Sequence, residues 1–309
     1  MGASFALSGG MKRSNRIYRC PFSKLCPVPV QKGSYFRTSD RKRVRRFRCR
    51  RCGRTFSTAT LSPRAWQKKR QINQALARLL SSNCSMRRSA LLLKINRKTV
   101  ARRLPFLADG ARVAQQAFLK RYEKKKALSV QFDDLETFEH SKHRPVSVAL
   151  AVEQKTRVIL GFSLSQMPAK GVTASYSREK YGPRADRRPE GWNLLFSELK
   201  RVVAPDAYFL SDQNPHYPHY VKKFFPLSQH RTVKGGRGAI RGQGELKKVT
   251  FDPLFSLNHT FAMLRANISR LIRKTWCTTK KMDRLADHIA LYVSFHNRKL
   301  LKPPLKAHS

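Results

Sequence analysis

The sequence predicts an α/β protein in which a sheet-containing domain follows two small N-terminal modules. Two cysteine pairs lie in a basic stretch at residues 16–60, apolar residues recur with a helical period over 65–107, and strand-like runs precede alternating helices and strands over 128–300. Within the last region, residues 170–191 are polar and are expected to form an insertion or mobile loop. Residues 1–15 are expected to be a disordered extension.

The cysteine pairs predict a structural zinc site. Five residues separate Cys20 from Cys26, and two separate Cys49 from Cys52. Two thiol pairs supply the ligands of a tetrahedral Zn²⁺ site, although the first spacing is wider than usual. Buried thiols without a metal are the alternative. A module this small has little core, so the metal would supply part of its folding energy.

Residues 65–107 are expected to form a helix-turn-helix that binds DNA. An apolar stripe through Leu76 and Leu80 ends at the break SSNCS, in which Ser85 is a candidate N-cap. The segment RKTVARRL would be the third helix, with Val100 and Leu104 facing the core. Its basic residues would face the groove or its phosphates: Arg97, Lys98, Arg102 and Arg103. An ordinary three-helix module with a solvated basic face is the alternative.

The charge of the chain predicts a polyanionic partner. Lys and Arg number 65 against 18 Asp and Glu, a formal net charge of +47. Such a field attracts double-stranded DNA, and it also allows an RNA-binding role. An anionic membrane surface is disfavoured because no run of about 18 apolar residues is present. Cys84 and Cys277 are isolated, which fits a reducing compartment, so a cytoplasmic, nucleoid-associated protein is expected.

Acidic residues follow two predicted strands of the C-terminal region. LSVQF ends at Asp133 and Asp134, and YFLS ends at Asp212. Aspartates on neighbouring strands can hold Mg²⁺ or Mn²⁺, whereas each alone can equally be a cap or turn acid. The third ligand is open between Asn258, which begins an amphipathic segment, and Glu245, which follows a Gly-rich loop.

Over residues 16–300 the chain resembles bacterial insertion-sequence transposases of the DDE type that carry an N-terminal zinc ribbon and a helix-turn-helix. The resemblance rests on five segments: RRFRCRRCGRTFS, RKTVARRL, VQFDDLETFEH, YFLSDQN and LNHTFAMLRANISRLIRKT. It implies an RNase H-like catalytic domain, with a mixed sheet flanked by helices. It also implies binding of terminal inverted repeats, metal-dependent strand cleavage and strand transfer, and a homo-oligomer that brings two DNA ends together.

The resemblance also implies roles for individual residues. Asp133 would be the first catalytic aspartate and Asp212 the second, both holding magnesium, with Asp134 in a neighbouring position. A shift of one residue would exchange Asp133 and Asp134. The third position usually holds a glutamate, and Asn258 stands there in this chain. The resemblance therefore leaves a subgroup that uses asparagine, with Glu245 as the alternative third residue, or a catalytically inactive DNA-binding regulator derived from a transposase.

Overall fold

The computed structural model describes residues 18–23, 25–26, 28–65, 67–234, 252–272 and 275–301. The chain divides into two compact units between Ile72 and Asn73. The extension predicted at residues 1–15 and the alternative ligand Glu245 lie outside the described residues.

The first unit is built on a small antiparallel sheet. Its strands are β1 (Val30–Arg37), β2 (Lys42–Arg48) and β3 (Thr55–Ser57), with a 3₁₀ turn at Thr38–Asp40 between the first two. Phe47 on β2 pairs directly with Phe56 on β3, and their rings stack with centroids 5.6 Å apart. These rings and the buried Cys20 and Cys49 make the core of the unit. Phe47 and Phe56 therefore both face the inside of this small unit.

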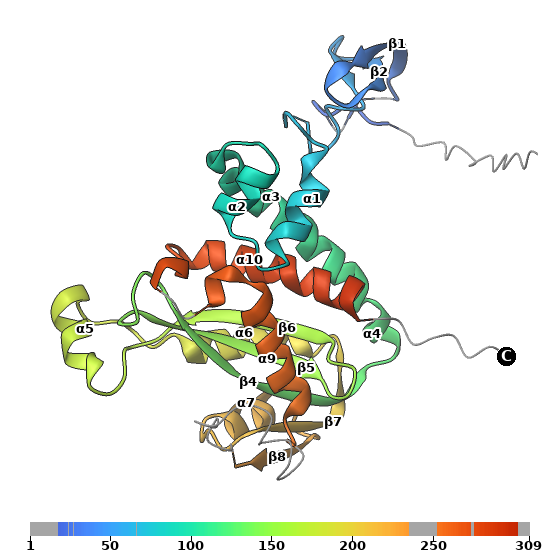
Figure 1. Ribbon diagram of the computed structural model, residues 1–309. Helices are drawn as coiled ribbons and strands as arrows, with labels where there is room; N and C mark the ends of the chain where they lie inside the picture. Colours follow the sequence, from blue (N-terminus) through green and yellow to red (C-terminus); the bar gives the residue numbers. More distant parts are fainter. Residues whose placement is uncertain are drawn as a thin grey trace, which may run out of the picture. The chain divides into compact units, whose positions relative to one another are not determined.

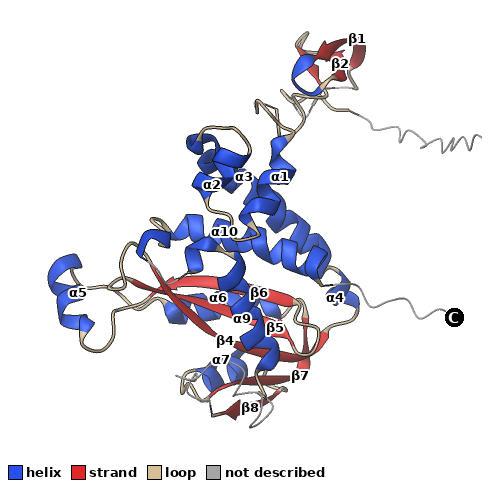
Figure 2. Ribbon diagram, viewed as in Figure 1, coloured by secondary structure: helices blue, strands red, loops and turns tan. Residues whose placement is uncertain are grey.

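The second unit contains a mixed five-stranded sheet (Figure 2). Its strands are β4 (Ala127–Phe138), β5 (Pro145–Glu153), β6 (Ile159–Gln166), β7 (Val203–Asp212) and β8 (Gln229–Val233), in the order β6-β5-β4-β7-β8. β5 runs antiparallel to both neighbours, whereas β7 and β8 run parallel to β4. The predicted mixed α/β class is confirmed at this level.

Helices cover both faces of this sheet (Figure 1). The helices are α1 (Ile72–Leu80), α2 (Met86–Leu92), α3 (Arg97–Leu119), α4 (Arg121–Lys124), α5 (Thr173–Tyr181), α6 (Arg188–Leu199), α7 (Tyr217–Phe224), α9 (Phe255–Asn267) and α10 (Met282–Phe295). Helices α6 and α7 pack on the face that contains Phe132, and α9 and α10 pack on the face that contains Leu135. A 3₁₀ turn at Ser269–Leu271 follows α9, another lies at Thr275–Cys277, and a π turn at His296–Leu300 follows α10. None of the helices described here is both long and apolar enough to cross a membrane.

The three predicted DNA-binding helices belong to the same compact unit as the sheet. Ser85 caps α2 as expected, because its hydroxyl accepts a hydrogen bond from the Arg88 N–H at 3.2 Å. Helix α3 does not end near residue 107 but continues to Leu119. It packs along α10, whose Leu291 completes the apolar core of the three helices. Helix α3 therefore continues through the segment that leads to the sheet.

The interpretation of residues 170–191 as a loop was wrong, because the segment contains α5 and the start of α6. Two local contacts explain this difference. The buried Ser177 on α5 donates a hydrogen bond to the His143 carbonyl oxygen at 2.6 Å, which ties α5 to the β4–β5 turn. Asp186 accepts a hydrogen bond from the Arg188 N–H at 3.0 Å, at the start of α6. Both helices are therefore stabilised by side-chain hydrogen bonds, which the polar composition of the segment does not predict.

Candidate functional site

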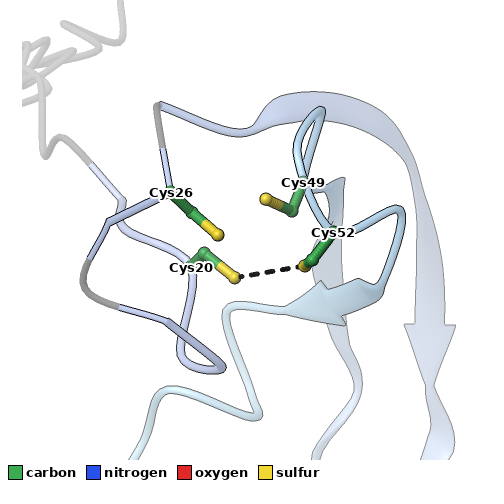
Figure 3. A group of neighbouring side chains, drawn as sticks. All are labelled: Cys20, Cys26, Cys49 and Cys52. Atoms are coloured by element: carbon green, nitrogen blue, oxygen red, sulfur yellow. Dashed lines mark hydrogen bonds between the residues drawn. The ribbon is translucent and has the colours of Figure 1, made fainter.

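The second cysteine pair lies on a tight turn directly after β2. The Cys49 N–H donates to the Arg54 carbonyl oxygen at 2.9 Å, and the Gly53 N–H donates to the Cys49 carbonyl oxygen at 3.0 Å. Gly53 has φ of 66°, in the left-handed region that glycine adopts without strain. This turn directs both thiols of the pair toward the first pair (Figure 3).

The four cysteines could hold a structural metal such as zinc. Their sulfur atoms all lie within 4.8 Å of one another, and the Sγ atoms of Cys20 and Cys52 are 3.8 Å apart. Four sulfurs placed tetrahedrally at about 2.3 Å from Zn²⁺ would be about 3.8 Å from each other. The pKa of Cys49 falls to about 6, mainly because the Cys52 backbone N–H donates to its sulfur, whereas the hydrogen bond with Cys49 raises the pKa of Cys26 to about 12. A low pKa favours the thiolate, which is the form that binds metal.

The N-terminus of α3 presents basic side chains to solvent. Asn96 caps the helix, since its Oδ1 accepts a hydrogen bond from the Lys98 N–H at 2.8 Å. Arg97, Lys98 and Arg102 are exposed, as a phosphate-contacting helix requires. Their predicted contact with DNA stays a prediction.

Arg103 does not face solvent, and the prediction that it faces DNA was wrong. Its exposure is 7%. It lies three residues after Val100 and next to Leu104, both fully buried, so it belongs to the inward-facing side of α3. Arg103 therefore does not share the exposed side of α3 with Arg97, Lys98 and Arg102.

The three helices are fixed to α10 by polar contacts. His288 on α10 is fully buried, and its Nε2–H donates to the Leu80 carbonyl oxygen at the end of α1, at 2.6 Å. Burial lowers the pKa of His288 to about 4, so the ring is neutral at physiological pH. Arg112 on α3 forms an ion pair with the buried Asp287 at 2.8 Å. The position of α3 on the sheet domain is therefore set by a buried interface.

Asp133 and Asp212 lie side by side at the level where β7 ends. Gln131 on β4 pairs with Leu210 on β7 in parallel register, and each aspartate lies two residues further along its strand. Neighbouring strands are about 4.8 Å apart, and residues at the same level of a parallel pair share a face. Asp134 falls on the opposite face by the same alternation. The register therefore pairs Asp133, and not Asp134, with Asp212.

Asp133 is held in an environment that opposes its negative charge. Its pKa is raised to about 7, first by burial and then by the charge of Asp212. Two donors partly offset this effect: the Tyr217 hydroxyl donates to its Oδ1 at 2.8 Å, and the Asp134 N–H does so at 2.6 Å. Asp212 accepts a hydrogen bond from the Asn214 N–H at 3.0 Å.

Tyr217 is a site residue that the sequence reasoning did not single out. It is 1% exposed, and its hydroxyl lies between the carboxylates of Asp133 and Asp134, 3.4 Å from the Asp134 Oδ2. Asp134 also accepts a hydrogen bond from the Ser147 hydroxyl, and burial raises its pKa. The available signal was the position of Tyr217, five residues after Asp212 at the start of α7.

The start of α9 lies against β4 close to the aspartates. The side chain of Gln131 donates to the Pro253 carbonyl oxygen at 2.8 Å and accepts from the Leu257 N–H at 3.0 Å. Gln131 precedes Asp133 by two residues on the same face of β4. The first turn of α9 is therefore fixed beside the strand that carries Asp133.

Asn258 lies in this first turn and is exposed. Its Nδ2 donates to the Asp252 carboxylate at 2.8 Å, which orients the amide group. Among the described residues, no further acid, histidine or cysteine forms a group of three with Asp133 and Asp212. The structure thus brings the two aspartates together and places Asn258 on the adjoining helix.

An open pocket borders Asp212 and is rimmed by cations. Lys170 follows β6, Arg188 begins α6 and Lys234 follows β8, and all three line the pocket together with Asp212 and the turn at 213–216. Side chains from three separate elements therefore place positive charge around one carboxylate. A phosphate group entering this pocket would meet cationic neighbours.

No protein-family model matches the sequence, and no curated protein sequence is significantly similar to it. Function is therefore inferred from the chemistry of the side chains and their placement.

Proposed function

We propose that this protein is a DDE-type DNA transposase that binds the terminal inverted repeats of its own insertion sequence and catalyses metal-dependent strand cleavage and strand transfer. Its second unit would supply an RNase H-like catalytic domain, and its first unit a zinc ribbon. The five-stranded mixed sheet with helices on both faces supports the former. The four clustered cysteines support the latter.

The observation that carries the proposal is the pairing of Asp133, within β4, with Asp212 at the end of the adjacent strand β7. Two carboxylates beside each other in a partly buried site repel, and this repulsion contributes to the raised pKa of Asp133. A divalent cation relieves such repulsion, and carboxylate oxygens are the ligands that Mg²⁺ and Mn²⁺ prefer. When bound, the metal would stabilise the negative charge that develops as a phosphodiester is attacked.

The remaining residues would orient the ligands and the DNA. Tyr217 would hold the Asp133 carboxylate through its hydroxyl. Asn258 would supply an amide oxygen as the third ligand, because its amide nitrogen is already engaged by Asp252. The exposed Arg97, Lys98 and Arg102 would contact DNA at the N-terminus of α3.

The test is the Asp212→Ala variant on a labelled duplex carrying the inverted repeat that borders the gene. Cleavage in Mg²⁺ or Mn²⁺ should be lost, while binding of the same duplex should remain. Asp206→Ala is the matched control, since Asp206 is exposed near the other end of the same strand. Cleavage that persists in Asp212→Ala would reject the assigned role.

The regulator remains the competing function because Asn258 replaces an acid. It would be favoured if folded wild-type protein bound the inverted repeat and cleaved it with neither ion. Asn258→Glu then provides a second measurement, since a restored carboxylate would add the missing negative ligand. Cleavage gained by this variant would identify a catalytic site that has lost one charge.

A further inference from the structure

We infer that α5 and the β4–β5 turn form a DNA-contacting surface that holds duplex DNA beyond the catalytic aspartates. We call this surface, residues 139–144 and 168–187, the α5 arm. The inference rests on the proposed function, which assigns DNA as the substrate but gives this arm no role. Figure 1 shows α5 projecting away from the sheet and its covering helices.

The arm is a fixed structure and not a loose insertion. Glu139 forms ion pairs with Arg144 at 3.0 Å and with Arg184 at 3.5 Å. One acid therefore connects the β4–β5 turn to the segment between α5 and α6. Ser177 adds the hydrogen bond from α5 to the turn. These contacts engage Glu139 within the arm. On α5 the exposed Glu179 lies between the exposed Arg178 and Lys180, so the outer surface has a net positive charge.

The outer surface of the arm combines cations with tyrosines. Lys142, Arg178 and Lys180 are exposed, and no ion pair in the described part of the chain includes them. Tyr176 and Tyr181 are 44% and 41% exposed, and the Lys180 ammonium lies 5.4 Å and 5.8 Å from their ring centres. Cations supported by hydroxyl-bearing rings are the groups that contact phosphates and sugars in protein–DNA interfaces.

The arm lies at the end of the sheet where β7 stops at Asp212, since β4 runs parallel to β7. β4 continues five residues beyond Asp133 to Phe138, and the β4–β5 turn follows directly. Five residues of strand span about 17 Å, which corresponds to about five base pairs at 3.4 Å each. The insertion itself leaves the sheet after β6, and its two ends supply Lys170 and Arg188 to the pocket at Asp212. DNA with its scissile phosphate at Asp212 would therefore reach the arm within half a helical turn.

Duplex DNA is the occupant that these features favour. The cations are spread over a helix and a separate turn, so they match phosphates along a backbone better than one bound anion. The arm thus adds non-specific affinity on one side of the cleavage point.

The test compares two variants of equal charge by fluorescence anisotropy across a salt series. The arm variant is Lys142→Gln with Arg178→Gln and Lys180→Gln. The control is Lys124→Gln with Lys125→Gln and Arg201→Gln, exposed residues at the opposite end of the sheet. On a labelled duplex of about 30 base pairs, the arm variant should lower the slope of log affinity against log salt by about two to three, and the control by less than about one. Both variants should unfold at the wild-type temperature.

Equal losses of slope in the two variants would overturn the inference. A loss confined to a duplex with a single-stranded tail would also overturn it, because the arm would then hold unpaired DNA. The two probes are the plain duplex and the duplex with a single-stranded tail. If wild-type protein bound neither of them, the proposed function would fail together with the inference. If wild-type protein bound both probes and the arm variant matched the wild type, only the inference would fail.

Discussion

Replacing Asp133 with asparagine should stabilise the protein above neutral pH. The pKa of this partly buried aspartate rises from 3.8 to about 7 in the folded protein. At about 1.4 kcal/mol for each tenfold change, ionising Asp133 in its folded environment costs roughly 4 kcal/mol. Because the side chain is only partly buried, we expect about half of this amount, ~2 kcal/mol. An asparagine has nearly the same shape and can accept the same hydrogen bond from Tyr217, but it carries no charge.

The sign of the pH dependence follows from proton binding. Between about pH 4 and pH 7 the folded state keeps a proton on Asp133 that the unfolded chain has lost. Its contribution to the free energy of unfolding therefore decreases as pH rises through this window, and it is constant above the window. The stability difference between Asp133→Asn and wild type should be small near pH 4 and largest near pH 8.

Urea unfolding at both pH values measures this difference, with Asp206→Asn as an exposed control on β7. Added Mg²⁺ should then stabilise the wild type by about 2.7 kcal/mol at a hundredfold excess over Kd, and the variant far less. The reasoning is refuted if Asp133→Asn is less stable than wild type at the higher pH. It is equally refuted if both proteins respond to Mg²⁺ alike.

Three further predictions concern the other sites. A colorimetric assay should find about one Zn²⁺ per chain in the wild type and much less in Cys49→Ser, whose first unit should be unfolded. A wild-type protein without zinc would contradict this prediction. Tyr217→Phe should raise the Mg²⁺ concentration needed for half-maximal cleavage about tenfold, because Asp133 loses the donor that orients it; an unchanged requirement would contradict this. Arg102→Ala should weaken DNA binding with unchanged stability, whereas Arg103→Ala should lower the free energy of unfolding by about 2 kcal/mol, measured by urea titration. The reverse pattern would show that Arg103 is the residue that contacts DNA.

The features that the sequence predicted correctly are those that depend on neighbouring residues. Cys49 and Cys52 sit on one turn, so their spacing alone constrains where their thiols point. Ser85 caps a helix because its own hydroxyl reaches the N–H three residues later. Asp212 follows an apolar run and ends β7, where functional side chains gather in α/β sheets. The expectation that a strand ends at Asp133 and Asp134 was wrong, because β4 continues to Phe138. Each of these signals is contained within a few residues of sequence.

The features that the sequence did not reveal depend on tertiary contacts. The side of α3 that faces inward is set by α10, so the burial of Arg103 cannot be derived from its charge. Tyr217 reaches Asp133 only because α7 folds back over the sheet after β7. Helix α5 lies in a polar segment that is fixed to the β4–β5 turn at two points. Ser177 on α5 donates to His143 of the turn, and Arg184, which follows α5, pairs with Glu139 at the start of the turn. No periodicity of the segment itself contains that information.

The charge of this chain has opposite effects at long and short range. At long range, the net charge of +47 makes capture of a polyanion favourable wherever it approaches. At short range, Lys170 and Arg188 beside Asp212 already form ion pairs with Glu136 and Asp186. Their charge is partly neutralised, and the pKa of Asp133 stays raised despite them. Among the described residues, no ion pair includes Asp133 or Asp212. A divalent metal ion is the partner that would place positive charge directly between the two carboxylates without displacing the residues that would draw DNA to the site.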